Sequence, residues 1–189
     1  MSASCSCVIP NEVDHPAQLA SLVGQDQQGW YAVYTLSRHE KQVALQAECA
    51  GVDCFVPLYK SVRRWKDRRK ELELALFPGY VFVRINLSER LSVLRLPGVV
   101  QIVGFGGKPA RLPEAEIDGL RAGLASHTPL HPHPYVRTGK KVRISGGPMA
   151  GLEGILLRRK NTCRVALSID LIMRSVAVEV DEADIEPLK

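Results

Sequence analysis

The chain has 189 residues, of which 46% are hydrophobic and 24% charged, a composition typical of soluble proteins with one or two small domains. Its longest apolar runs are too short to cross a membrane, and the N-terminus lacks the basic start and apolar stretch of a secretory signal. The formal net charge of +5 favours an anionic partner such as nucleic acid, but only weakly, because many basic proteins bind none.

The five cysteines indicate neither a disulfide framework nor a metal site. Their number is odd, and no pair of Cys-x-x-Cys motifs has the spacing of a zinc site. We expect Cys49 and Cys54 to be small core residues. Cys5 and Cys7 lie in a polar segment, where metal binding is a weaker alternative. A reducing cytoplasm is therefore the expected location, and neither a metal nor a cofactor is expected.

Residues 1–28 show no sustained hydrophobic periodicity and are rich in Ser, Gln, Asp and Pro. Such a segment buries too little apolar surface to fold, so we expect a disordered tail. Residues 30–35 are rich in β-forming side chains and predict the first strand. The first folded domain is expected to span residues 29–125.

A helix is predicted over residues 37–50. Ser37 and Glu40 have the spacing of a capping box, in which each side chain bonds the backbone amide of the other residue. The start of this helix is basic, with Arg38, His39 and Lys41. Because cations at a helix N-terminus oppose the helix dipole, they do not serve helix stability. They indicate either contact with phosphate or a solvated face.

The next segment predicts a basic β-hairpin. Residues 53–59 form one predicted strand and lead into residues 60–70, of which seven are basic and one is acidic. Lys66 and Asp67 are the predicted turn, and residues 71–76 return. Because like charges at this density repel one another, we expect an arm that binds nucleic-acid backbone rather than a solvated loop. The candidate contacts are Arg63, Arg64, Lys66, Arg68 and Arg69.

A Pro-Gly turn opens the strand predicted over residues 77–85. Val81, Val83 and other alternate apolar residues suit a core on one face of this strand. Tyr80 and Phe82 share the opposite face. Two explanations for these aromatic residues remain open, namely a second helix packed on that face or a surface that binds a partner.

The remainder of the first domain is predicted to contain short elements. A helix carrying Leu91 and Leu94 is followed by a strand at residues 99–103, a glycine-rich turn at residues 104–109 and a helix at residues 113–125. Strands interleaved with helices and joined by hairpins predict an α+β fold, here an α/β sandwich with an antiparallel sheet and flanking helices.

Residues 126–135 contain three prolines and predict an extended linker with solvated histidines. Beyond it, short strands and tight turns over residues 136–189 predict a small SH3-like β-barrel that folds independently. Its glycine-rich loop at residues 146–154 is not a nucleotide-binding loop, because Leu152 stands where lysine is needed. Met149 and Leu152 are expected at the loop tip, where apolar residues rarely serve a core.

Two groups of residues together resemble one family. The first consists of Trp30-Tyr31, Glu40-Lys41, Phe55-x-Pro57, the run from Leu76 to Val83, and Pro97-Gly98-Val99. It is similar to the N-terminal (NGN) domain of the NusG family of transcription elongation factors. The second, residues 139–165 with Gly147-Pro148, Gly151 and Gly154, is similar to a KOW motif. Residues 98–109 and 38–41 look closer to the specialised paralogues that include RfaH and the UpxY antiterminators.

The resemblance implies a transcription elongation or antitermination factor whose NGN domain binds the clamp helices of the largest RNA polymerase subunit. The positions that match this apolar surface are Tyr34, Phe77, Tyr80, Phe82, Ile102 and Phe105. A polar contact with the opposite jaw of the polymerase is implied for Ser88, Glu89 and Arg90. Pausing or termination would be suppressed by this binding.

The resemblance also implies partners for the basic residues and for the KOW domain. Upstream or non-template DNA matches Arg38, His39, Lys41 and the basic hairpin, and ribosomal protein S10 or Rho matches Met149 and Leu152. We expect a monomer without enzymatic activity, because no nucleophile–base pair, carboxylate pair or metal cluster is recognisable. A ribosome-associated KOW protein that binds RNA is the alternative.

Overall fold

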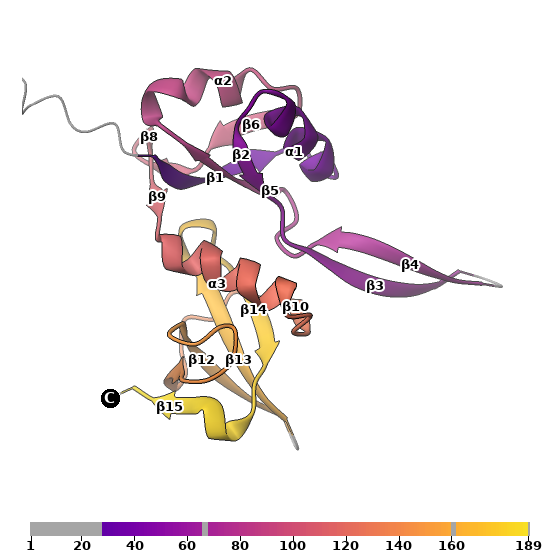
Figure 1. The fold of residues 1–189 in the computed structure, drawn as a ribbon, viewed down its shortest axis with the longest axis vertical. Helices are drawn as coiled ribbons and strands as arrows, with labels where there is room; N and C mark the ends of the chain where they lie inside the picture. The colour runs from indigo at the N-terminus through magenta and orange to yellow at the C-terminus, as the bar shows by residue number, and fades with distance from the viewer. Residues whose placement is uncertain (1–27, 66–67, 160–161, 189) are drawn as a thin grey trace, which may run out of the picture.

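The computed structural model describes residues 28–65, 68–159 and 162–188. Their strands and helices form an N-terminal and a C-terminal domain, with helix α3 (Glu114–Ala125) lying between the two (Figure 1). Most of the expected disordered tail, residues 1–27, and the predicted hairpin turn at Lys66 and Asp67 lie outside these residues. In the described part of the chain, no helix is long and apolar enough to span a membrane.

The N-terminal sheet has the strand order β2-β5-β1-β6, and β9 also pairs with β1. All of these pairings are antiparallel. Its strands are β1 (Gly29–Thr35), β2 (Asp53–Phe55), β5 (Tyr80–Ile85), β6 (Val99–Ile102) and β9 (Arg111–Leu112). The helices of this half of the chain are α1 (Glu40–Cys49), the 3₁₀ turn η1 (Leu87–Glu89), α2 (Arg90–Leu94) and α3 (Glu114–Ala125). The predicted α+β sandwich is confirmed.

One face of this sheet packs against α1 and α2. Val81 and Val83 of β5 lie in one buried cluster with Tyr31 of β1, Val43 of α1 and Val93 of α2. The alternation predicted for β5 is therefore correct. On α2 the buried residue is Val93, whereas Leu91 and Leu94, the residues singled out from the sequence, are exposed. Cys49, expected in the core, is exposed at the end of α1.

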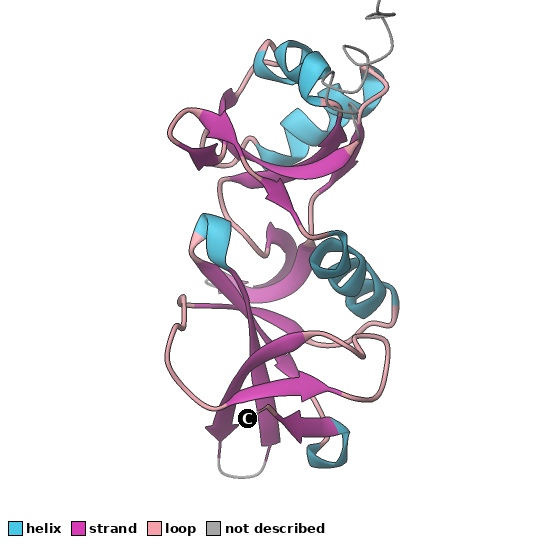
Figure 2. Ribbon diagram, turned by 90° about the vertical axis from the view of Figure 1, so that its left-hand side faces the viewer, coloured by secondary structure: helices cyan, strands magenta, loops and turns pink. Residues whose placement is uncertain are grey.

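The other face of the sheet packs against α3, which lies between the sheet and the C-terminal strands (Figures 1 and 2). Trp30 and Phe82 from the sheet share a buried cluster with Ile117 and Leu120 of α3. The guanidinium of Arg121 lies 4.5 Å from the centroid of the Trp30 ring. Cation–π contacts of this kind strengthen packing in addition to burial. A second helix therefore covers the aromatic face.

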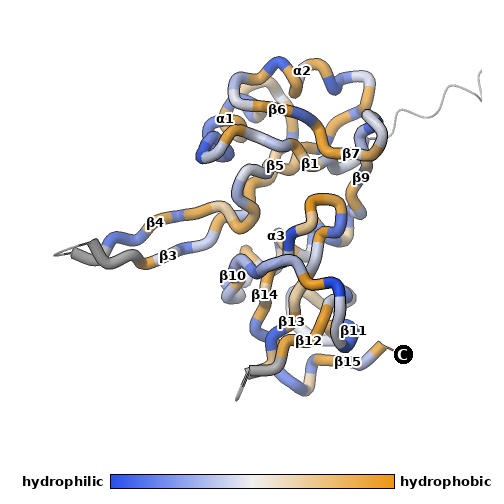
Figure 3. Tube along the Cα trace, turned by 180° about the vertical axis from the view of Figure 1, so that it is seen from behind, coloured by the Kyte–Doolittle hydropathy of each residue, from blue (hydrophilic) through white to orange (hydrophobic). Residues whose placement is uncertain are grey.

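Two hairpins leave the body of the domain. β3 (Leu58–Trp65) and β4 (Arg68–Ala75) pair along their length and project away from both domains (Figure 3). β7 (Gly104–Phe105) and β8 (Lys108–Pro109) form the smaller hairpin where a glycine-rich turn was predicted.

The C-terminal domain is a six-stranded antiparallel sheet of order β10-β14-β13-β12-β11-β15. Its strands are β10 (Leu130–His133), β11 (Lys141–Ile144), β12 (Glu153–Arg159), β13 (Thr162–Ile169), β14 (Arg174–Glu179) and β15 (Ile185–Pro187), with 3₁₀ turns η2 (Asp170–Ile172) and η3 (Glu182–Asp184). The β-rich second domain is confirmed. The linker prediction is wrong for residues 130–133, because β10 pairs with β14 along its whole length.

The predicted capping box is also wrong. Helix α1 begins at Glu40, and no side chain caps its first turn. Arg38 has a left-handed φ of 65°, so the chain turns between Ser37 and Glu40 instead of entering the helix directly. The buried Glu40 carboxylate accepts a hydrogen bond of 2.7 Å from the backbone amide of Gly79. It thereby fixes the Pro-Gly turn that opens β5.

We expect Glu40→Ala to lower the free energy of unfolding by about 1.5–3 kcal/mol, because a buried amide loses a charged acceptor. Urea denaturation followed by circular dichroism measures this change. Glu48→Ala, the same substitution at an exposed site on α1, is the control and should cost far less. Equal losses in the two variants would contradict the role given to Glu40.

Candidate partner-binding surfaces

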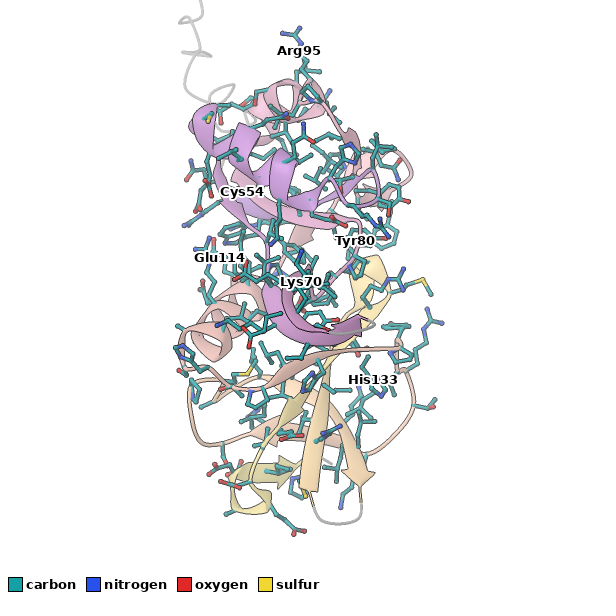
Figure 4. The ribbon with its side chains drawn as sticks, turned by 90° about the vertical axis from the view of Figure 1, so that its right-hand side faces the viewer. Cys54, Lys70, Tyr80, Arg95, Glu114 and His133 are labelled. Atoms are coloured by element: carbon teal, nitrogen blue, oxygen red, sulfur yellow. The ribbon has the colours of Figure 1, made fainter. Side chains whose placement is uncertain are left out.

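The residues expected to bind RNA polymerase divide into an exposed and a buried group. Tyr34 is 41% exposed and Phe105 is 73% exposed. Tyr80 and Ile102 are half-buried. The rings of Tyr34 and Tyr80 are in contact, with centroids 5.5 Å apart. Tyr80 lies at the level where the two domains meet (Figure 4). Tyr80 packs against the cluster beneath α3, and Ile102 against the cluster beneath α1 and α2. We call these four residues, three aromatic and one aliphatic, the open aromatic edge.

Phe77 and Phe82 are buried, which corrects the expectation that they face a partner. The Phe82 ring packs edge-on against Phe77, with centroids 5.6 Å apart, and lies 6.3 Å from Phe55. Both residues belong to the cluster that includes α3 and the C-terminal core. The sequence reveals the alternating faces of β5 but not the distant element that covers the second face.

Helix α3 also packs against the glycine-rich loop of the C-terminal domain. A Cβ atom built on Gly119 would lie 2.3 Å from Leu152 Cδ1, and one built on Gly123 would lie 2.7 Å from Met149 Sδ. Both distances are shorter than real contacts, so any side chain at either position would have to displace Leu152 or Met149. Met149 is buried and Leu152 half-buried. The prediction that they lie exposed at a loop tip is therefore wrong.

The two domains share one continuous hydrophobic cluster. It extends from Trp30 and Phe82 of the sheet through Ile117 of α3 to Val142 and Met149 of the C-terminal domain. At the base of the projecting hairpin, Tyr59 meets His131 of β10 edge-on, with ring centroids 6.5 Å apart. The expected independence of the domains stays a prediction, but here their cores are in contact.

Ser88, Glu89 and Arg90 are exposed on η1 and the start of α2. Arg90 lines a groove of about 550 Å³ together with Leu94, Ile102 and Lys108. Arg90, one of the residues predicted to contact the opposite jaw, therefore lies beside Ile102 of the open aromatic edge.

The basic residues at the start of α1 lie beside the projecting hairpin. Arg38 is exposed in its left-handed conformation, and His39 Nδ1 lies 3.0 Å from the Ser37 carbonyl oxygen. Lys41 Nζ forms an exposed ion pair of 3.3 Å with Glu73 of β4. This pair brings two basic segments that are distant in sequence to one side of the domain.

The register of the hairpin separates its charges. Near the base, Lys60 lies opposite Glu73. Farther out, Arg64 lies opposite Arg69 and Arg63 lies opposite Lys70. Like charges directly opposite each other destabilise a sheet. In this register the outer half of the hairpin sets basic residues opposite basic residues, whereas the base sets a basic residue opposite an acidic one, a charge pattern that favours an anionic partner. The side chains of residues 63–69, including Lys66, lie outside the described part.

Sequence reasoning did not identify Glu116 on α3 as a site residue. It lines an interdomain cavity of about 980 Å³ together with residues of the C-terminal domain. Burial, and to a smaller extent the nearby charge of Asp170, raise the pKa of Glu116 to about 7. An acidic residue in the first turn of a helix is ordinary in sequence, so no local signal reveals it. The described residues contain no group of three or more potential metal ligands of the His, Cys, Asp or Glu type.

Residues 28–121 match the family described as "Transcription termination factor nusG". The NusG protein of Lactococcus lactis is 30% identical over 183 residues, which cover 89% of this chain and 97% of the relative. The chain belongs to the NusG family. NusG of Haemophilus influenzae is 27% identical over 175 residues, covering 84% of this chain and 94% of that protein. Closeness to the specialised paralogues of the NusG family stays a prediction.

A solved structure described as "Domain interaction in Thermotoga maritima NusG" has a similar fold, with a TM-score of 0.54 and 23% sequence identity. The similarity covers 86% of this chain and 98% of the solved chain. It therefore extends over both domains of the NusG architecture and supports the assigned fold.

We expect Phe82→Ala to lower the free energy of unfolding by about 3–5 kcal/mol, because it opens a cavity in the cluster beneath α3. Guanidinium denaturation measures this loss. Phe105→Ala makes the same change at a side chain that is 73% exposed and serves as the control. The assignment of Phe82 to the core fails if both variants keep the stability of the parent.

Proposed function

We propose that this NusG-family protein is a transcription elongation and antitermination factor that binds RNA polymerase through its N-terminal domain. Membership of the NusG family carries the proposal, since the similar proteins of Lactococcus lactis and Haemophilus influenzae are named transcription termination/antitermination proteins. We assign it no enzymatic activity and place it in the cytoplasm with the polymerase, where it suppresses pausing or termination.

The clamp helices of the largest polymerase subunit dock on the open aromatic edge in this proposal. Large exposed aromatic side chains are common anchors of protein interfaces, and Phe105 and Tyr34 have the required exposure. Ser88, Glu89 and Arg90 contact the opposite jaw. Phe77 and Phe82 join the interface only where the cover over them is removed.

Ribosomal protein S10 or Rho binds the glycine-rich loop of the C-terminal domain in this proposal. The apolar residues offered to it, Met149 and Leu152, lie against Gly123 and Gly119 of α3. A partner that uses these two side chains therefore binds only after the loop leaves α3. The apparent affinity for such a partner is therefore proportional to the fraction of molecules in which the domains have separated.

Upstream or non-template DNA binds the outer half of the β3–β4 hairpin and the basic start of α1. The register of the hairpin, which sets basic residues opposite one another in its outer half, supports this assignment. The Lys41–Glu73 pair supports a common surface, because it joins α1 to β4. Contacts with phosphates alone carry no sequence information, so this surface would bind DNA without selecting a sequence.

Replacement of Arg64 and Arg69 by serine should weaken duplex DNA binding and reduce its salt dependence. Removing one phosphate contact lowers the slope of log affinity against log salt concentration by about 0.9, so the double variant should lose about two units if both side chains contact phosphate. Fluorescence anisotropy with a labelled duplex at several salt concentrations measures both quantities.

The control for net charge replaces Arg95 and Arg174, which are exposed outside the hairpin, by serine. Arg95 lies at the end of the N-terminal domain away from the C-terminal strands (Figure 4). The hairpin assignment is wrong if this control loses as much affinity and as much slope as the Arg64 and Arg69 double variant.

An opened variant tests the proposed function as a whole. Gly119→Leu should separate the domains by collision with Leu152. The variant should bind purified RNA polymerase more tightly, because Tyr80, which packs against the shared cluster, and Phe105, which lines the interdomain cavity, gain exposure. Pause lifetimes in a transcription assay with the purified polymerase should shorten accordingly. Ala125→Leu adds the same side chain at an exposed position of α3 and should behave as the parent.

The proposal fails if neither the parent nor Gly119→Leu binds polymerase or alters pausing. Co-sedimentation with ribosomal subunits in place of polymerase would support the ribosome-associated class instead.

A further inference from the structure

The cavity between the domains brings two carboxyl groups from different domains close together. Glu116 enters it from α3, and Asp170 enters it from η2 of the C-terminal domain. Glu116 is half-buried, and its Oε2 atom is fully buried without a hydrogen-bond partner. A buried carboxylate without a donor is unstable in its charged form. This geometry favours the protonated, neutral form of the Glu116 side chain.

The other carboxyl group is held in a different way. The hydroxyl of Tyr135 donates a hydrogen bond of 2.8 Å to Asp170 Oδ1. A hydrogen bond to the charged form of a carboxyl group favours that form. The negative charge of Asp170 acts against ionisation of Glu116 on the facing element.

Two of the cations that line the cavity have partners other than Glu116. Arg111 of β9 pairs with Glu114 at 3.2 Å, and the Arg137 guanidinium lies over the Tyr135 ring at 5.5 Å. Lys141 of β11 and Glu153 of β12 also line the cavity, and Glu153 pairs with Arg143 at 2.7 Å. None of these described side chains donates a hydrogen bond to the buried Oε2 atom of Glu116.

We propose that closure of the two domains takes up a proton at Glu116, so that the closed arrangement is stabilised by acid and loosened by base. Separation of the domains would expose the cavity and move Asp170 away. Glu116 would then ionise as an ordinary surface glutamate. The proton thus controls access to the loop of Met149 and to the surface of α3 that this loop covers.

The sign of the pH dependence follows from linkage. The pKa of Glu116 is raised from 4.5 to about 7 in the closed arrangement. The stabilisation is therefore fully present below pH 4.5 and is lost as the pH rises through 7. Between about pH 6 and about pH 8 the closure equilibrium constant should fall roughly tenfold.

The test is a carbon-13 NMR titration of the glutamate side-chain carboxyl groups in the full chain, in which Glu116→Gln identifies the resonance of Glu116. We expect Glu116 to titrate near pH 7 in the parent protein. In the opened variant Gly119→Leu it should titrate at least about one pH unit lower, which corresponds to a tenfold linkage between protonation and closure. Gly123→Leu makes the same comparison if Gly119→Leu does not fold.

Two further variants separate a local effect from a general one. Asp170→Asn should lower the pKa of Glu116 while the domains stay closed, as reported by the ε-methyl resonance of Met149. Asp118→Asn removes an exposed carboxylate from α3 and should leave the titration of Glu116 unchanged. The inference is overturned if Glu116 titrates like an ordinary glutamate in the parent, or at the same pH in the parent and both opened variants. No polymerase enters the measurement, so its outcome is independent of the proposed function.

Discussion

Helix α3 is held between two surfaces, and the arrangement of the whole molecule depends on this double contact. Ile117 and Leu120 bury the aromatic face of the N-terminal sheet. Gly119 and Gly123 admit the side chains of Leu152 and Met149 from the C-terminal domain. Glycine within a helix costs about 1 kcal/mol relative to alanine. The chain accepts this cost twice within one turn of α3, where each glycine permits a contact with the other domain.

This contact relates the two proposed binding functions, that of the N-terminal domain for polymerase and that of the C-terminal loop for a second partner. Met149 and Leu152 lie against α3, and Phe105 lines the interdomain cavity, so separation of the domains exposes apolar side chains in each domain to a partner. Tyr34 is exposed and the basic hairpin projects away from both domains (Figure 3), whereas Phe105 lines the interdomain cavity and Tyr80 packs against the shared cluster. In the proposed function, Tyr34 and the hairpin can therefore meet a partner in the closed arrangement, whereas the loop of Met149 can do so only after opening.

Local patterns in the sequence were sufficient for the elements but not for their partners. The alternation of β5, the amphipathic α3 and the β-rich C-terminal half are all visible from residue spacing, and the family motifs add their order. What covers Phe82, what Met149 touches and where the carboxylate of Glu40 binds are decided by residues far away in sequence. Glycines that signal turns elsewhere serve helix packing at Gly119, and a proline-rich segment pairs as β10 because Leu130 completes the C-terminal core.

The most direct test of this account is a nuclear Overhauser experiment on the full chain with carbon-13 labelled methionine methyl groups. The sequence has three methionines, so the resonance of Met149 is readily assigned. At pH 6 we expect cross-peaks between the Met149 ε-methyl group and the α-protons of Gly123 on α3. A Met149 methyl group that shows cross-peaks only within the C-terminal domain would contradict the account, because α3 would then not hold the two domains together.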